Sequence, residues 1–110
     1  MFNELAKEVF ANAASKGFHD DGPREDLILG KLMLIVTEIA EAAEEWRNGH
    51  LITDVYLKDG KPEGAPIELA DALIRILDFC HSHHIDIDSA VRLKMEYNTT
   101  RPFMHGGKRA

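Results

Sequence analysis

The sequence predicts an all-α subunit of four helices, and three observations support this prediction. Apolar residues recur every three to four positions in four segments, proline and glycine fall between or at the ends of these segments, and β-forming residues cluster in one short stretch. The length of 110 residues corresponds to one domain. We therefore expect a single helical domain over residues 1–102, followed by a basic C-terminal tail over residues 103–110.

The first two helices are expected over residues 2–16 and 25–48. Gly17 can end the first helix in the left-handed conformation, and residues 18–23 are rich in turn formers. The second segment runs without proline until Gly49. The apolar positions that predict the first helix lie at helical spacing, namely Phe2, Leu5, Ala6, Val9, Phe10 and Ala13.

The helical pattern fails between residues 49 and 66. Residues 55–57 are β-formers, and residues 58–60 form a Lys-Asp-Gly turn signal. We expect a loop or a small flap here, between the second and third helices.

The third helix is expected to begin at Pro66, which suits the first helical position, and to end near His83. Asp86 or Asp88 can cap a fourth helix. This helix should end before Pro102, because the residue before a proline is pushed out of the helical conformation.

The composition disfavours several classes of protein. Thirteen Lys and Arg against nineteen Asp and Glu give a net charge of −6, which repels nucleic acid, so no nucleic-acid partner is expected. The single cysteine, Cys80, cannot form an intrachain disulfide, which fits a reducing compartment and predicts a cytoplasmic protein. The longest uncharged apolar run, residues 32–37, is far shorter than the roughly 20 residues that span a bilayer, so no membrane association is expected.

Two of the predicted helices each carry a pair of carboxylates three residues apart, and therefore on one face. The pairs are Glu38 with Glu41 and Glu68 with Asp71. Such a pair can belong to a solvated helix face, but the surrounding positions here are almost all apolar and leave little perimeter for solvent. Four inward-facing carboxylates would repel one another unless a cation neutralised them. Oxygen ligands favour Mg²⁺, with Mn²⁺ as an alternative, whereas a di-iron site would require a Glu-x-x-His motif that neither pair has.

The paired acids, separated by 26 residues, resemble the all-α nucleotide pyrophosphohydrolases of the MazG-like group. The C-terminal sequences KMEYNTTRP at 94–102 and HGGK at 105–108 also resemble this group, so the resemblance covers residues 25–108. The chain departs from the pattern at Thr37, where the group often has a further glutamate directly before the first pair.

The resemblance implies Mg²⁺-dependent hydrolysis of a nucleoside triphosphate to the monophosphate and pyrophosphate, by a homodimer or homotetramer of four-helix subunits. The implied metal ligands are Glu38, Glu41, Glu68 and Asp71, with Glu41 orienting the attacking water. The apolar second helix also predicts a subunit interface. The fourth helix carries cations and an amide suited to phosphates on one face, unless that face is simply solvated, and these candidate substrate-binding residues are Lys94, Asn98 and Arg101.

Two other functions remain open at this point. One is a catalytically silent helical module that binds nucleotide or partner helices as a regulator. The other is a related enzyme of the same helical superfamily, similar to phosphoribosyl-ATP pyrophosphohydrolase, which cleaves the same linkage in a different substrate. The intact acids in both pairs favour an enzyme, and the residues do not identify the preferred base or sugar.

Overall fold

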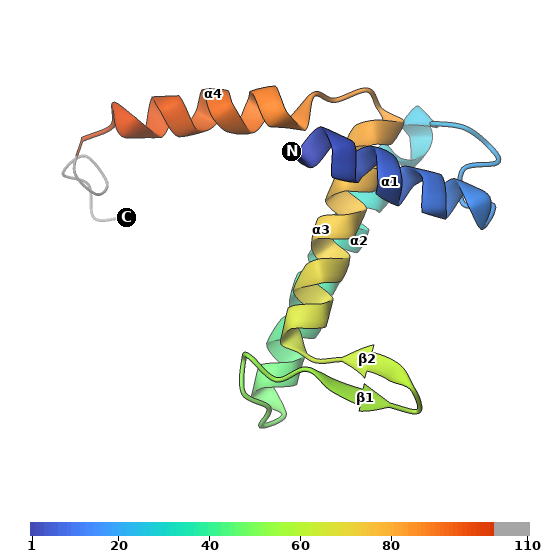
Figure 1. The fold of residues 1–110 in the computed structure, drawn as a ribbon, viewed down its shortest axis with the longest axis vertical. Helices are drawn as coiled ribbons and strands as arrows, with labels where there is room; N and C mark the ends of the chain where they lie inside the picture. The colour runs from blue at the N-terminus through green and yellow to red at the C-terminus, as the bar shows by residue number, and fades with distance from the viewer. Residues whose placement is uncertain (103–110) are drawn as a thin grey trace.

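The computed structural model describes residues 1–102 and is centred on two antiparallel helices, α2 (Ile28–Arg47) and α3 (Ala65–Ser82), which lie side by side (Figure 1). A short 3₁₀ turn, η1 (Glu25–Leu27), leads into α2. Helix α1 (Phe2–Ser15) packs across the C-terminal part of α3. Helix α4 (Ile87–Thr99) packs on α1 and projects away from the α2–α3 pair (Figure 1). The described residues are therefore mainly helical, which confirms the all-α class, and each helix lies close to its expected range.

A β-hairpin occupies the segment in which the helical pattern fails. Strands β1 (Tyr56–Lys58) and β2 (Lys61–Glu63) pair antiparallel, with Tyr56 opposite Glu63. The turn residues Asp59 and Gly60 have φ angles of 53° and 78°, as a two-residue turn with two left-handed positions requires. The hairpin lies at the end of the molecule where α2 finishes and α3 begins (Figure 1).

Gly64 connects this hairpin to α3 through a close backbone approach. Its φ of 122° is a conformation that side chains rarely adopt, and a Cβ atom at this position would overlap the carbonyl oxygen of Asp54. Glycine at this position therefore allows the chain to enter α3 directly from β2.

The starts of α1 and α4 cap each other. The side-chain oxygen of Asn3 accepts hydrogen bonds from the backbone N–H groups of Ile87 and Asp88, at 3.0 and 3.3 Å. In return, the carboxylate of Asp88 accepts from the backbone N–H groups of Phe2 and Asn3, at 2.6 and 3.2 Å. Asp86 caps α4 itself by accepting from the backbone N–H of Ser89. Both aspartates that could cap the fourth helix thus act at a helix start, but Asp88 serves α1.

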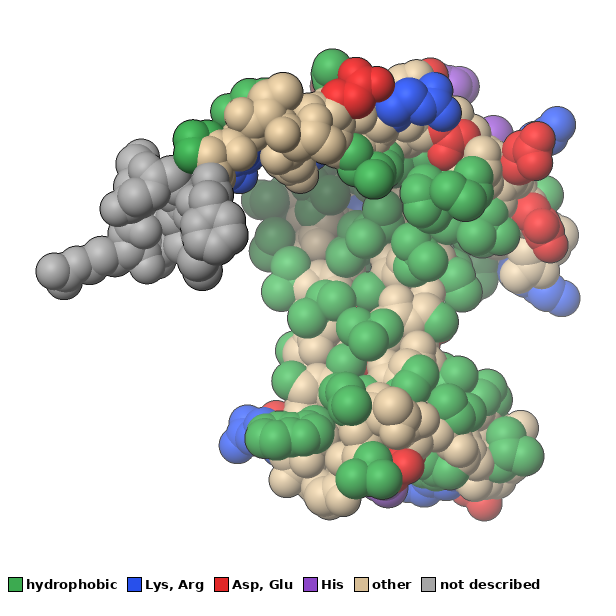
Figure 2. All heavy atoms as spheres, turned by 60° about the vertical axis from the view of Figure 1, so that its left-hand side comes forward, with side chains coloured by type: hydrophobic (Ala, Val, Ile, Leu, Met, Phe, Trp, Pro, Cys, Tyr) green, Lys and Arg blue, Asp and Glu red, His purple; other side chains and the backbone are tan. Residues whose placement is uncertain are grey.

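The hydrophobic core of residues 1–102 is small. The buried hydrophobic residues are Ala6, Ala42, Ala65, Ala72, Leu77 and Cys80, of which only Leu77 is a large side chain. Large apolar side chains of both central helices are exposed instead, including Met33, Val36 and Ile39 on α2 and Leu69 and Leu73 on α3. Figure 2 shows hydrophobic side chains covering much of the narrow part of the molecule. Among residues 1–102, no helix has both the length and the apolar character that crossing a membrane requires.

Candidate metal centre

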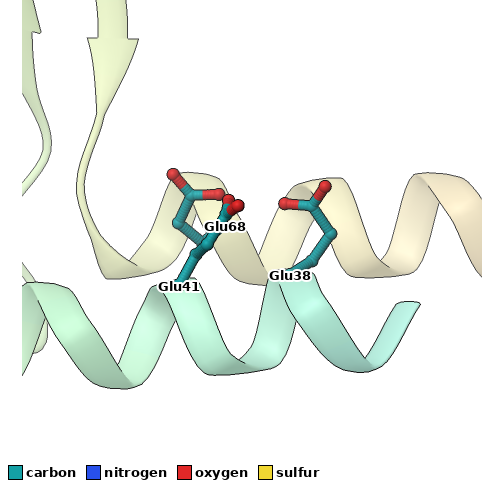
Figure 3. A group of neighbouring side chains, drawn as sticks. All are labelled: Glu38, Glu41 and Glu68. Carbon is teal, nitrogen blue, oxygen red and sulfur yellow. The ribbon is translucent and has the colours of Figure 1, made fainter. Parts of the chain in front are cut away.

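Three of the four predicted metal ligands converge where α2 and α3 meet. Glu38 and Glu41 project from adjacent turns of α2, and Glu68 projects from the first turns of α3 (Figure 3). One carboxylate oxygen from each residue lies within 4.8 Å of the other two. Glu38 is buried, Glu68 is half-buried and Glu41 is exposed, so the cluster is open to solvent on the Glu41 side.

Asp71, the fourth predicted ligand, lies one helical turn beyond Glu68 and outside this group of three. Burial raises the pKa of its carboxyl, and the charge of Glu38 adds to this effect. Asp71 and Glu38 also line one cavity together. Asp71 therefore belongs to the rim of the carboxylate cluster, on the side that faces the cavity.

The cluster has the electrostatics expected of unneutralised acids. Burial, followed by the neighbouring Glu41 and Glu38 carboxylates, raises the pKa of Glu68 to about 7. Burial would also raise the pKa of Glu38, but the hydrogen bond from Arg75 and smaller contributions from Glu68 and Glu41 outweigh it, so this pKa lies below its ordinary value. The cluster therefore favours either a proton on Glu68 or a bound cation near neutral pH.

The donors in the cluster are carboxylate oxygens, which suit a hard divalent cation. Three carboxylates carry more negative charge than one Arg75 guanidinium neutralises, and the raised pKa of Glu68 reflects this excess. Both the donor chemistry and the charge of these residues therefore fit Mg²⁺ or Mn²⁺.

A second group of carboxylates joins the first through Glu68. One oxygen each of Glu45, Glu63 and Glu68 also lies within 4.8 Å of the others. The hydroxyl of Tyr56 donates to both carboxylate oxygens of Glu45, at 2.9 and 3.1 Å, so that the hairpin is attached to α2. Sequence reasoning missed both Glu45 and Glu63. Glu45 follows Glu41 by four residues, so the two share a helix face, and this spacing could have indicated Glu45. Glu63 is brought to the group only by the fold of the hairpin.

The predicted phosphate-binding residues of the fourth helix lie away from the carboxylates of the same chain. Lys94 and Asn98 are exposed on α4, and Arg101 follows the end of that helix. The ammonium group of Lys94 lies 4.8 Å from the centre of the Tyr97 ring. Because α4 packs on α1 and projects outward, the fold of a single chain does not bring these residues to Glu38, Glu41 or Glu68 (Figure 1). The HGGK sequence and the basic tail lie outside the described residues.

Three cations lie near the acids, and sequence reasoning missed all of them: Arg75, Lys31 and Lys61, whose ammonium group lies 3.8 Å from a carboxylate oxygen of Glu63. The Nε–H of Arg75 donates to the Oε1 atom of Glu38 at 2.9 Å. Arg75 and Lys31 line the same cavity as Glu38 and Asp71. A signal was present for Arg75, since it follows Asp71 by four residues and shares its helix face.

Comparisons of the chain with protein-family models, with curated proteins and with solved structures gave no match. Membership of the MazG-like group therefore stays a prediction.

Proposed function

We propose that the protein is a MazG-like, metal-dependent nucleoside triphosphate pyrophosphohydrolase that releases a nucleoside monophosphate and pyrophosphate. The observation that supports this proposal most directly is the convergence of Glu38, Glu41 and Glu68 from two helices into one cluster of oxygen donors. Such a cluster suits Mg²⁺, which commonly serves enzymes that act on nucleotide phosphates. A role in removing unwanted nucleotides from the cytoplasmic pool fits this activity.

The residues of the cluster would have different roles, because their surroundings differ. Glu38, Glu41 and Glu68 would hold Mg²⁺ or Mn²⁺, with Asp71 joining them from the next turn of α3. When bound, the ion neutralises phosphate oxygens and lowers the pKa of a water molecule. Arg75 keeps Glu38 ionised. Glu41 is the most exposed of the three and has no ion-pair partner within residues 1–102, so its free oxygen is available to orient the attacking water.

The proposed enzyme is a homodimer or homotetramer. The exposed apolar side chains of α2 and α3 support this proposal, because a monomer rarely leaves so much apolar surface uncovered. Since α4 projects away from its own carboxylates, its residues Lys94, Asn98 and Arg101 would contact phosphates only at the site of another subunit. The net charge of −6 favours a small-molecule substrate over nucleic acid.

The proposal can be tested by incubating the protein with a panel of canonical and damaged nucleoside triphosphates plus Mg²⁺ and separating the monophosphate and pyrophosphate produced. We expect turnover of at least one member, dependent on the divalent cation. Glu41→Gln or Asp71→Asn should abolish turnover while the helices stay folded. Glu44→Gln provides a matched control, because Glu44 is exposed on α2 and pairs with Arg47 rather than with the cluster. Absence of turnover across the panel would favour the regulatory module, and full activity of Glu41→Gln would contradict the proposed site.

A further inference from the structure

A cavity of about 710 Å³ lies beside the carboxylate cluster and is bounded by α1, α2 and α3. Its α1 side is largely apolar and includes Leu5, Val9 and Ala13. The opposite side carries Glu38 and Asp71, followed by the side chains of Arg75 and Lys31. Within residues 1–102, no other lysine or arginine lines this cavity.

Arg75 has N–H groups that do not take part in its hydrogen bond to Glu38. Only its Nε–H group makes a hydrogen bond within the described residues, to Glu38, although a guanidinium group has five N–H donors. Its side chain is 44% exposed. The terminal nitrogens can therefore bind an anion while Nε continues to hold Glu38.

Lys31 is the second cation that lines the cavity. It precedes Glu38 by seven residues, which places it on the same face of α2, about 10 Å along the helix axis. Lys31 is half-buried, and no carboxylate within residues 1–102 lies within 4.0 Å of its ammonium group. It also borders, with Arg75, a smaller cavity of about 60 Å³.

The acidic residues of the same cavity leave these cations available. Asp78 is paired with His19, whose Nε2 atom lies 2.7 Å from its carboxylate. Glu8 is on α1, across the cavity from the cations. Beside the paired carboxylates of Glu38 and Asp78, the α2–α3 side of the cavity therefore carries the ammonium group of Lys31 and the terminal N–H groups of Arg75, which have no partner within the described residues.

We propose that Lys31 and Arg75 form an anion-binding position in the same subunit as the carboxylates, and that it receives a phosphate group of the substrate. The identification of the anion as a phosphate rests on the proposed function. A polyphosphate bound in this cavity would meet the oxygen cluster and, directly beside it, these two cations. Guanidinium and ammonium groups both bind phosphate, and the partial burial of Lys31 strengthens its contact.

The test is a calorimetric titration of the full chain with inorganic pyrophosphate in the presence of Mn²⁺, together with a separate titration of Mn²⁺ alone. Lys31→Gln is the main variant, because Lys31 does not touch the carboxylates. We expect it to weaken pyrophosphate binding by about tenfold or more and to leave Mn²⁺ binding unchanged. Lys7→Gln is the matched control, since it removes the same charge from the exposed side of α1, outside the cavity, and should bind pyrophosphate as the wild type does.

Three further variants complete the design. Arg75→Gln should also weaken pyrophosphate binding, and Arg75→Lys should recover only part of it, because an ammonium group cannot hold Glu38 and an anion at once. Lys94→Gln measures the contribution of α4 in the same titration. Wild-type affinity in Lys31→Gln would overturn the proposal, whether or not Lys94→Gln loses affinity, and so would absence of pyrophosphate binding by the wild-type protein.

The outcomes separate this inference from the proposed function. Turnover of a nucleoside triphosphate with unchanged pyrophosphate binding in Lys31→Gln would support the enzyme and overturn the anion position. Loss of pyrophosphate binding in Lys31→Gln, with no turnover across the nucleotide panel, would support the anion position and contradict the enzyme.

Discussion

Replacing Glu68 with glutamine should stabilise the metal-free protein at alkaline pH and have little effect in acid. The pKa of Glu68 is raised from 4.5 to about 7. Each pKa unit corresponds to about 1.4 kcal/mol, so ionising this carboxyl costs the folded state up to about 3 kcal/mol at pH 8. The folded state binds this proton more tightly than the unfolded state does, and stability therefore falls as the pH rises from about 4.5 through about 7. Glu68→Gln has no titratable proton at this position, so its free energy of unfolding should not fall in this way.

Urea denaturation at pH 5 and pH 8, in the presence of a chelator and at matched protein concentration, measures the effect. The free energy of unfolding of Glu68→Gln, relative to wild type, should increase by up to about 3 kcal/mol between the two pH values. The control Glu44→Gln should show no such increase, because Glu44 is exposed. Adding Mn²⁺ at pH 8 should stabilise wild type more than Glu68→Gln. An equal difference between variant and wild type at both pH values would refute the reasoning.

Three further predictions concern the fold and the assembly. Gly64→Ala should lower the free energy of unfolding by at least about 1 kcal/mol, because the position needs a φ of 122° and has no room for a Cβ. Gly30→Ala lies in the interior of α2, where a Cβ meets open space, and should raise the free energy of unfolding by up to about 1 kcal/mol. Urea denaturation measures both changes, and changes of equal sign would contradict the prediction. Asp88→Ala should lower the melting temperature near neutral pH, and this difference should shrink as the pH falls through the lowered pKa of Asp88; circular dichroism melts at pH 7 and pH 2 can follow it, and an equal difference at both pH values would contradict it. Light scattering should give a mass above the 12.4 kDa of one chain, and a mass of 12.4 kDa at micromolar concentration would exclude the proposed oligomer.

The helices could be predicted because their limits depend on local signals. Gly49 follows the end of α2, and Pro66 occupies the first turn of α3. The Lys-Asp-Gly signal likewise marks a turn, and the structure places it in a hairpin where the sequence predicted only a loop or a small flap. The direction of α4 could not be predicted, because it depends on hydrogen bonds with the start of α1, more than 80 residues away.

The sequence could predict those parts of the candidate site in which residues share one face of a helix. Spacing placed Glu38 with Glu41 on one face, and the fold brings Glu68 to them. The pairing of Arg75 with Glu38 and the position of Glu63 required tertiary structure, since the first joins two helices and the second depends on the hairpin. The spacing of the α4 residues gave a common face but no information on the direction in which that face would point.

The reciprocal capping of α1 and α4 has a consequence for the order of folding. The hydrogen bonds of Asp88 with the amides of Phe2 and Asn3 close a loop of about 85 residues. Contacts so distant in sequence form slowly, because the chain must lose entropy before they can stabilise it. During synthesis, these amides lack their partner until residue 88 has been added. The first helix in the sequence is therefore among the last to complete its hydrogen bonds, and its opening turn should exchange amide hydrogens together with that of α4.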